Sequence, residues 1–156
     1  MAGYKGHIVG GVVAYALLFF ILKHQTDSLL VYAQWFGCAL AGALFPDIDV
    51  KSKGQKYFYW LVLAAVLYLI CSLRFEMIAV ISVLSITPML SKHRGLFHEP
   101  WFVIMIPLLL WLCVLSWYPQ AAQQAFLAMI FFIVGALSHL FLDRGWRGIF
   151  RLKYRR

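Results

Sequence analysis

Two aspartates, Asp47 and Asp49, follow a proline at the end of a long apolar segment, and a loop with three lysines (51–56) comes next. Pro46 is expected to end the helix, because its ring clashes with the preceding turn and it lacks an N–H. Two carboxylates held close together repel each other unless a cation neutralises them, so the pair is a candidate set of metal ligands. The alternative is two solvated loop aspartates that pair with the lysines.

His139 and Asp143 form a second candidate pair near the end of the last apolar segment. Residues four apart on a helix share one face, so these two side chains can hold one ion. His139 lies about one turn inside the apolar boundary, where an unpaired polar group is costly. Gly135 continues the same stripe and lets another helix approach closely. The alternative is an interhelical hydrogen-bonded pair without a metal.

The segment 91–100 contains two histidines, His93 and His98, which can face a common point when the backbone turns at Gly95. Arg94 offers a planar bidentate donor suited to a phosphate or a carboxylate. Glu99 is a further carboxylate that could act as a general base. A basic interfacial loop would explain the cations of this segment, but it would not explain two histidines.

A seventh donor, His7, lies at the start of the first apolar segment. The predicted metal ligands are His7, Asp47, Asp49, His93, His98, His139 and Asp143. All are nitrogen or oxygen donors without a thiolate, which favours zinc, with manganese or iron as alternatives, over magnesium. Seven donors exceed one tetrahedral shell, so we expect two ions ~3.5–4 Å apart, bridged by an aspartate. The three cysteines lie singly in apolar runs and predict neither a disulfide nor a ligand pair.

The composition predicts an all-α integral membrane protein. Of the 156 residues, 63% are hydrophobic and only 13% are charged, which excludes an ordinary soluble domain. Six apolar segments predict six transmembrane helices: 8–22, 28–45, 57–73, 77–90, 101–118 and 124–142. The fourth is short and ends at Thr87-Pro88, so it is expected to be short or broken. The first reaches a spanning length only if residues 3–7 extend it.

Six crossings place most of the basic residues on one side of the membrane. Twelve lie there: Lys5, Lys51, Lys53, Lys56, Lys92, Arg94, Arg144, Arg147, Arg151, Lys153, Arg155 and Arg156. Only Lys23 and Arg74 fall on the other side. The positive-inside rule then makes both termini cytoplasmic. Every predicted metal ligand lies on this cytoplasmic side, although the ligands come from four separate parts of the chain.

We divide the chain into a transmembrane domain, residues 1–143, and a basic tail, residues 144–156. The tail mixes six basic residues with aromatic ones. It is expected to lie on the cytoplasmic leaflet and bind anionic lipid headgroups. Nucleic-acid binding is the rival interpretation of so basic a segment, and it is disfavoured because the tail directly follows a membrane helix.

The four motifs together carry a resemblance to a known family. They are His7, Phe-Pro-Asp-Ile-Asp (45–49), His-Arg-Gly-Leu-Phe-His (93–98) and Gly-Ala-Leu-Ser-His-Leu-Phe-Leu-Asp (135–143). In this order, and over nearly the whole chain, they resemble the YdjM-like family of inner-membrane metal-dependent hydrolases. The resemblance implies a bacterial inner-membrane location and a metal-dependent hydrolase. Where that family usually has a small hydroxyl residue, this chain has Glu99, which leaves open whether Glu99 is a ligand, a base or neither.

The sequence therefore predicts a hydrolase with its site at the cytoplasmic membrane surface, acting on a phosphoester of a membrane lipid. Arg94 would hold the anionic group, and Glu99 could serve as the base. One alternative is a non-catalytic scaffold whose metal ties helix ends together in a closed shell. Another is a metal or proton transporter, which would need polar residues at mid-membrane depth, where Gln34 and Ser82 are the main candidates.

The topology is directly testable. A reporter fused after Arg156 is expected to be cytoplasmic, because the basic residues number twelve against two. A periplasmic reporter signal would contradict the helix count and would separate the predicted ligands across the membrane.

Overall fold

The computed structural model describes residues 3–49, 52–73, 78, 82, 85–86 and 96–149, with side chains at all of these except 49, 53, 96 and 146–149. The described regions are helical and contain no strand. The α-helices are α1 (Tyr4–Leu22), α2 (Leu29–Leu44), α3 (Lys53–Cys71), α5 (Pro100–Trp117) and α6 (Ala122–Ile149). Short 3₁₀ helices connect or precede them: η1 (Lys23–Gln25), η2 (Phe45–Asp49), η3 (Leu96–His98) and η4 (Pro119–Ala121).

Five of the six predicted apolar segments correspond to these α-helices. Within the described residues, five helices are long and apolar enough to cross a membrane. The first begins at Tyr4 rather than at residue 8 and so gains the length that spanning requires. The predicted fourth segment, 77–90, lies largely outside the described residues. The all-α membrane fold is thus confirmed, whereas the count of six and the orientation of the termini stay predictions.

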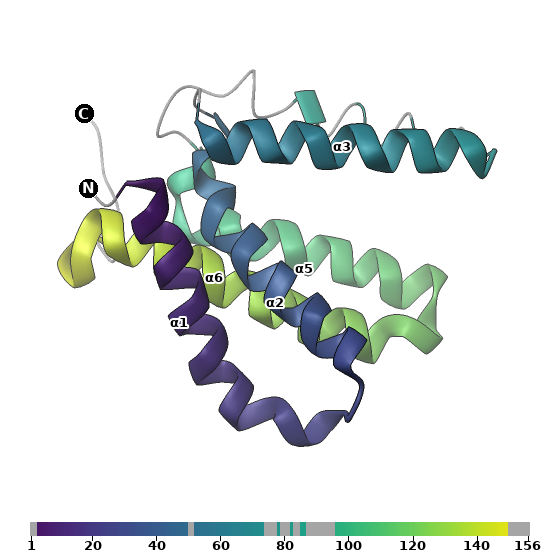
Figure 1. Cartoon of the computed structure of the whole chain (residues 1–156), viewed down its shortest axis with the longest axis horizontal. Coiled ribbons are helices and arrows are strands. Elements are labelled where there is room, and N and C mark those ends of the chain that lie inside the picture. The colour runs from purple at the N-terminus through teal and green to yellow at the C-terminus, as the bar shows by residue number, and fades with distance from the viewer. Residues whose placement is uncertain are drawn as a thin grey trace.

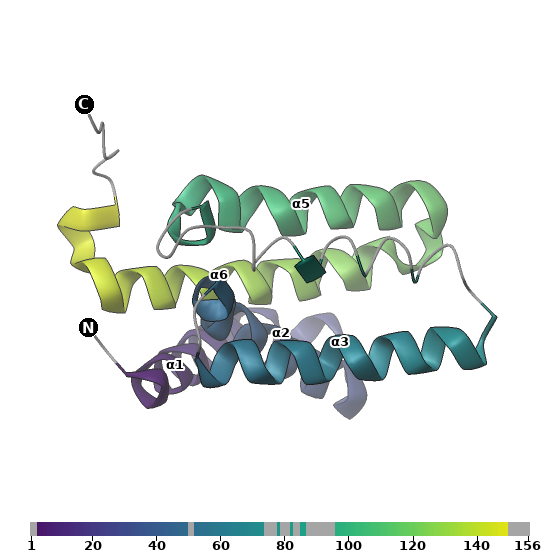
Figure 2. The ribbon, with the colours of Figure 1, turned by 90° about the horizontal axis from the view of Figure 1, so that it is seen from above.

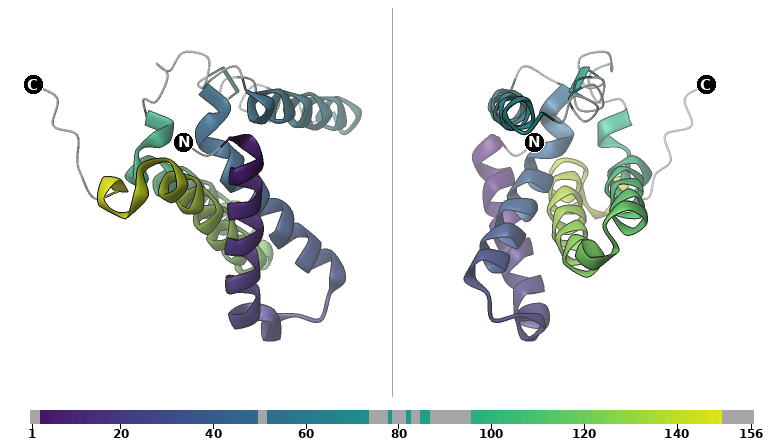
Figure 3. Two further views of the ribbon diagram at one scale, coloured as in Figure 1. Left: turned by 60° about the vertical axis from the view of Figure 1, so that its left-hand side comes forward. Right: turned by 90° about the vertical axis from the view of Figure 1, so that its right-hand side faces the viewer.

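Two helical hairpins form the body of the molecule. The α1–α2 hairpin turns through η1, and the α5–α6 hairpin turns through η4, so that the two hairpins lie against each other (Figure 1 and Figure 3). Among the described helices, α6 is central, because it packs against α1, α2 and α5. Helix α3 lies apart from these four helices (Figure 1), and its main described contact is with η2.

The crossing of α2 and α6 is close because glycines face backbone on both sides. A Cβ on Gly42 would overlap the carbonyl oxygen of Phe132, and a Cβ on Gly135 would overlap the carbonyl oxygen of Ala39. Only a hydrogen atom fits at either position. Lipid chains supply no hydrophobic drive for helix association, so this close backbone packing is the main means by which the two helices hold together.

Below this crossing, aromatic side chains fill the space between the hairpins. The rings of Trp35 and Phe131 are both fully buried and stack with their centroids 4.9 Å apart. Tyr15 and Tyr32 pack around them from α1 and α2. Large apolar side chains point outward on every helix, which suits a surface that faces lipid.

The first turn of α1 and the last turns of α6 lie at the same end of the bundle (Figure 1 and Figure 2). Helix α6 bends at Gly145, whose φ of 65° lies in the left-handed region that glycine adopts without strain. The bend falls one residue beyond the boundary predicted between the membrane domain and the tail.

The α2–α6 crossing generates a prediction with a matched control. Gly42→Ala and Gly135→Ala are expected to lower the midpoint of thermal unfolding in detergent, because overpacking typically costs ~1–3 kcal/mol. Gly37→Ala lies on the same helix as Gly42, with nothing within 4 Å of the added Cβ. It is expected to be neutral or stabilising, since alanine favours a helix by ~1 kcal/mol over glycine. Equal effects in all three variants would contradict the close packing.

Candidate metal site

Asp47 is held by the short helix η2 and by two side chains from the start of α3. Pro46 is buried in η2 and ends α2, as predicted. The Ser52 hydroxyl donates to the Asp47 carbonyl oxygen at 2.9 Å and accepts from the Gln55 N–H at 3.0 Å, which caps α3. The Gln55 side chain donates to the Ile48 carbonyl oxygen at 3.1 Å. These bonds fix the backbone of η2 and therefore the position from which the Asp47 side chain projects.

His98 is positioned by the aromatic residue that precedes it. Phe97 is 3% exposed and packs edge-on against Phe45 and Phe102, with ring centroids 5.4 and 5.0 Å away. Because Phe97 anchors η3 in the core, the next side chain, His98, is buried as well. Helix α5 begins immediately afterwards at Pro100, a residue well suited to a first helical turn.

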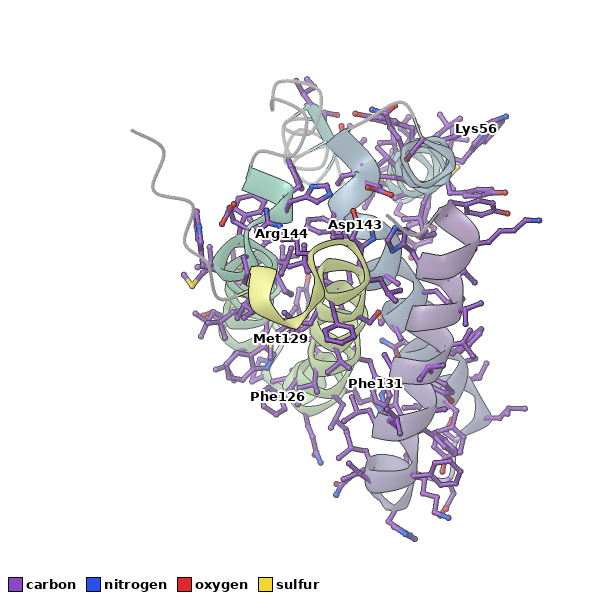
Figure 4. All side chains as sticks on the ribbon, turned by 90° about the vertical axis from the view of Figure 1, so that its left-hand side faces the viewer. Lys56, Phe126, Met129, Phe131, Asp143 and Arg144 are labelled. Carbon is purple, nitrogen blue, oxygen red and sulfur yellow. The ribbon has the colours of Figure 1, made fainter. Side chains whose placement is uncertain are left out.

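The remaining ligand candidates come from α1 and α6. His7 lies in the first turns of α1, and its ring stacks on that of His139 with centroids 3.7 Å apart and planes 16° apart. Asp143 follows one turn after His139 and points into the bundle (Figure 4).

Five of the seven predicted ligands converge at this end of the bundle. The distances are 3.4 Å between His7 Nε2 and Asp143 Oδ1, 3.5 Å between His139 Nε2 and Asp47 Oδ1, 3.7 Å between His98 Nε2 and Asp47 Oδ1, and 3.9 Å between His139 Nε2 and Asp143 Oδ2. They form two groups that could each hold a metal ion: His7, His139 and Asp143, and Asp47, His98 and His139. His139 belongs to both groups.

The tautomer of His139 follows from its contact with α2. Its Nδ1 lies 2.7 Å from the carbonyl oxygen of Ala43. A carbonyl oxygen can only accept, so Nδ1 carries the proton and donates it. In the neutral ring, Nε2 then carries a lone pair. This Nε2 is buried and has no hydrogen-bond partner among the described residues.

The site therefore requires a positive charge. The Nε2 lone pair of neutral His139 faces carboxylate oxygens of Asp47 and Asp143, and like partial charges in a buried place repel. Either a proton on Nε2 or a bound cation removes the conflict. Two ligand atoms that each lie ~2.1 Å from a tetrahedral zinc ion are ~3.4 Å apart, close to the spacings found here. The geometry and the nitrogen and oxygen donors thus fit a divalent metal.

His98 is ready to act as a ligand at neutral pH. Burial lowers its pKa to about 4, and His139 and Arg144 add to the shift while Asp47 and Asp143 oppose it. At pH 7 the imidazole is therefore neutral, so no proton has to leave His98 when a cation binds. A neutral imidazole nitrogen is the form that ligates zinc, manganese or iron.

In the predicted arrangement an aspartate bridges two ions, and this arrangement stays a prediction. The residue common to both groups is His139. Its Nδ1 is bonded to Ala43, and its Nε2 has a single lone pair, so His139 can ligate only one ion. If two ions bind, the second must be held without His139.

Other predicted residues lie partly or wholly outside this cluster. His93 and Arg94 lie outside the described residues, as does the side chain of Asp49. Glu99 belongs to neither ligand group, and its Oε1 accepts a hydrogen bond from Arg144 Nη2 at 3.2 Å. From the sequence, Arg144 was assigned to the basic tail and not to the site. Its position directly after Asp143 could have indicated that its guanidinium lies beside the cluster (Figure 4).

The fold and the cluster define an integral membrane protein with histidine and aspartate side chains gathered at one end of a helical bundle, able to hold a metal ion. The chain belongs to the YdjM inner membrane protein family, whose model matches residues 1–152. The resemblance inferred from the motifs is thus confirmed. No curated protein and no solved structure matches the chain.

The sharing of His139 gives a graded prediction for metal content. His139→Ala is expected to remove the ion that His139 ligates, whichever of the two groups holds it, because His139 is common to both. His7→Ala and His98→Ala each remove a ligand from one group, so each is expected to lower metal affinity by more than the ~10–100-fold that the loss of an outer hydrogen-bond partner costs, or to remove one ion of two. Elemental analysis of the purified variants measures the outcome.

The matched controls are His24→Ala and Asp27→Ala, which change exposed residues between α1 and α2 at the far end of α1 from His7. Both should keep the full metal content. Full occupancy in His139→Ala, with the protein still folded, would remove this residue from the coordination shell.

Proposed function

We propose that this protein is a metal-dependent hydrolase whose site lies at the cytoplasmic surface of the inner membrane. The observation that carries the proposal is the Nε2 lone pair of His139, which is buried between two carboxylates and has no hydrogen-bond partner in the part of the chain that the structure describes. Zinc is the favoured ion, with manganese or iron as alternatives, because the donors are imidazoles and carboxylates. Such an ion lowers the pKa of water to near ~7 and so supplies a nucleophile at neutral pH.

A phosphoester of a membrane lipid is the substrate that we favour. The ligands lie at the ends of membrane-spanning helices, at the depth where lipid headgroups are found. Arg144 brings a guanidinium to this end of the bundle, and its pairing with Glu99 holds the planar group in place. We propose that Arg94 and Arg144 bind the phosphoryl oxygens and that Glu99 orients Arg144 or accepts a proton from water.

One side of the cluster supports catalysis over a purely structural role. His7, His139 and Asp143 have almost no exposed surface, but the side chain of Asp47 is 23% exposed. A catalytic metal needs an open position for substrate or water, whereas a structural metal has a closed shell. Asp47 marks the side from which a substrate can approach.

A non-catalytic scaffold is the second candidate. The near-complete burial of four of the five gathered ligands favours it, because a closed metal site joins α1, α2 and α6 firmly. A transporter has less support, since Gln34 is exposed on α2 rather than facing the bundle interior.

Hydrolysis can be tested with a panel of phospholipids and isoprenoid phosphates in liposomes, together with the metal content of each preparation. Turnover should disappear on chelation and return with zinc or manganese. Arg94→Lys is expected to keep the metal and to lose ~10²–10³ in turnover, since a point charge replaces a preorganised bidentate donor. Arg74→Lys, predicted on the opposite side of the membrane, is the matched control and should keep its activity.

The scaffold makes the opposite prediction. If metal-loaded protein hydrolyses no member of the panel and metal removal instead lowers the unfolding temperature, the ion has a structural role. The same two measurements on one preparation therefore separate the two candidates.

A further inference from the structure

An apolar hollow lies on the membrane face of the α1–α6 crossing, outside the ligand cluster. It has a volume of about 700 Å³ and runs along α1 past Val9, Val13 and Leu17, with Phe141 and Leu142 of α6 on its other wall. A second hollow of about 740 Å³ shares Leu17 and Phe141 with it and continues toward the end of α1 and the start of α5. Because they share lining residues, the two hollows form one groove, which we call the α1–α6 groove.

Of the residues that line this groove, only Lys5, at one end, is charged. Ser138 lines the wall, but its hydroxyl donates to the Gly135 carbonyl oxygen of its own helix at 2.7 Å, so it offers no free donor. Lys5 lies at the rim in the first turn of α1, is exposed, and has no ion-pair partner among the described residues. The groove is therefore apolar along its length, with the cation of Lys5, which pairs with no described carboxylate, at its mouth.

We propose that the α1–α6 groove binds an anionic phospholipid of the bilayer, with an acyl chain along α1 and the phosphate at Lys5. The chain matches the apolar walls, and the phosphate complements the ammonium group at headgroup level. A zwitterionic lipid carries a cation of its own, which would repel Lys5 and weaken the attraction between Lys5 and the phosphate. A soluble phosphate would leave the apolar walls without a partner.

This site does not depend on hydrolysis, because the groove lies beside the ligand cluster and shares no lining residue with it. Gly10 packs against Leu142 and Ser138 at the crossing, whereas His7 faces inward to His139. The proposed lipid lies in the groove beside the metal site, so it can stay bound while a substrate lipid occupies the metal site. The binding measurement is therefore separate from any activity assay.

The test uses the full-length protein in vesicles that contain a phosphatidylglycerol probe with a photoreactive group in the acyl chain. Peptide mapping is expected to place the label on Val9, Val13, Phe141 or Leu142. Val13→Trp should remove most of this label by filling the groove. Val12→Trp changes the neighbouring exposed valine, which lines neither hollow, and should keep the label.

The headgroup contact has its own pair of variants. Lys5→Glu is expected to weaken labelling by at least about fivefold, because it removes the attraction of one basic residue and adds a carboxylate that repels the headgroup. Lys56→Glu changes an exposed lysine of α3 that does not line the groove, and it should have a smaller effect. Metal content and the unfolding midpoint show that each variant is folded.

Several results would overturn the proposal. One is equal labelling by a phosphatidylcholine probe, and another is label spread evenly over α3 and α5. A third is equal loss of label in Val12→Trp and Val13→Trp. Crosslinks between two copies of the chain at Val13 would show that a second protein molecule, and not a lipid, covers the groove.

Discussion

The hydrogen bond from His139 Nδ1 to the carbonyl oxygen of Ala43 is the contact on which the site depends. It exists because α2 and α6 approach closely where Gly42 and Gly135 have no side chain. The bond fixes both the orientation of the ring and its tautomer. It thereby leaves a lone pair on Nε2, directed into a space lined by carboxylates. In metalloproteins, such an outer hydrogen bond commonly sets the ligating nitrogen of a histidine.

The two hairpins bring chemically matched residues to this point from distant parts of the chain. The α1–α2 hairpin supplies His7 and, through η2, Asp47, while the α5–α6 hairpin supplies Asp143 and, through η3, His98. An unpaired charge in such a place would destabilise the fold, because carboxylates buried near the membrane need a counter-charge. A bound cation would therefore both neutralise these carboxylates and hold the two hairpins together. In the hydrolase that we propose, catalysis also needs an open position at the metal, and we place it at the exposed side of Asp47.

Much of this arrangement was predictable from the sequence. Apolar runs of spanning length predicted five of the described helices. The polar residues at their ends predicted the candidate ligands, because such residues are rare in membrane segments. Gly135 and the small residues of α2 indicated the close crossing. The partner of His139 Nδ1 was not predictable, because it is a backbone carbonyl whose position depends on the crossing geometry. The Glu99–Arg144 pair joins residues 45 apart in the sequence and has no local signal. The presence of His139 in both groups likewise depends on the orientation of its ring, which the spacing of residues does not reveal.

The central claim is that His139 carries its proton on Nδ1 and offers Nε2 to a metal ion. Nitrogen-15 NMR of the protein with labelled histidine, in detergent at neutral pH, tests it most directly, with His139 assigned by the signal lost in His139→Ala. We predict a proton on Nδ1 both without and with metal, and a shift of the Nε2 signal, with the loss of any Nε2 proton, when zinc is added. A doubly protonated ring whose Nε2 signal does not respond to zinc, manganese or iron would show that a proton supplies the positive charge, and would contradict a metal site.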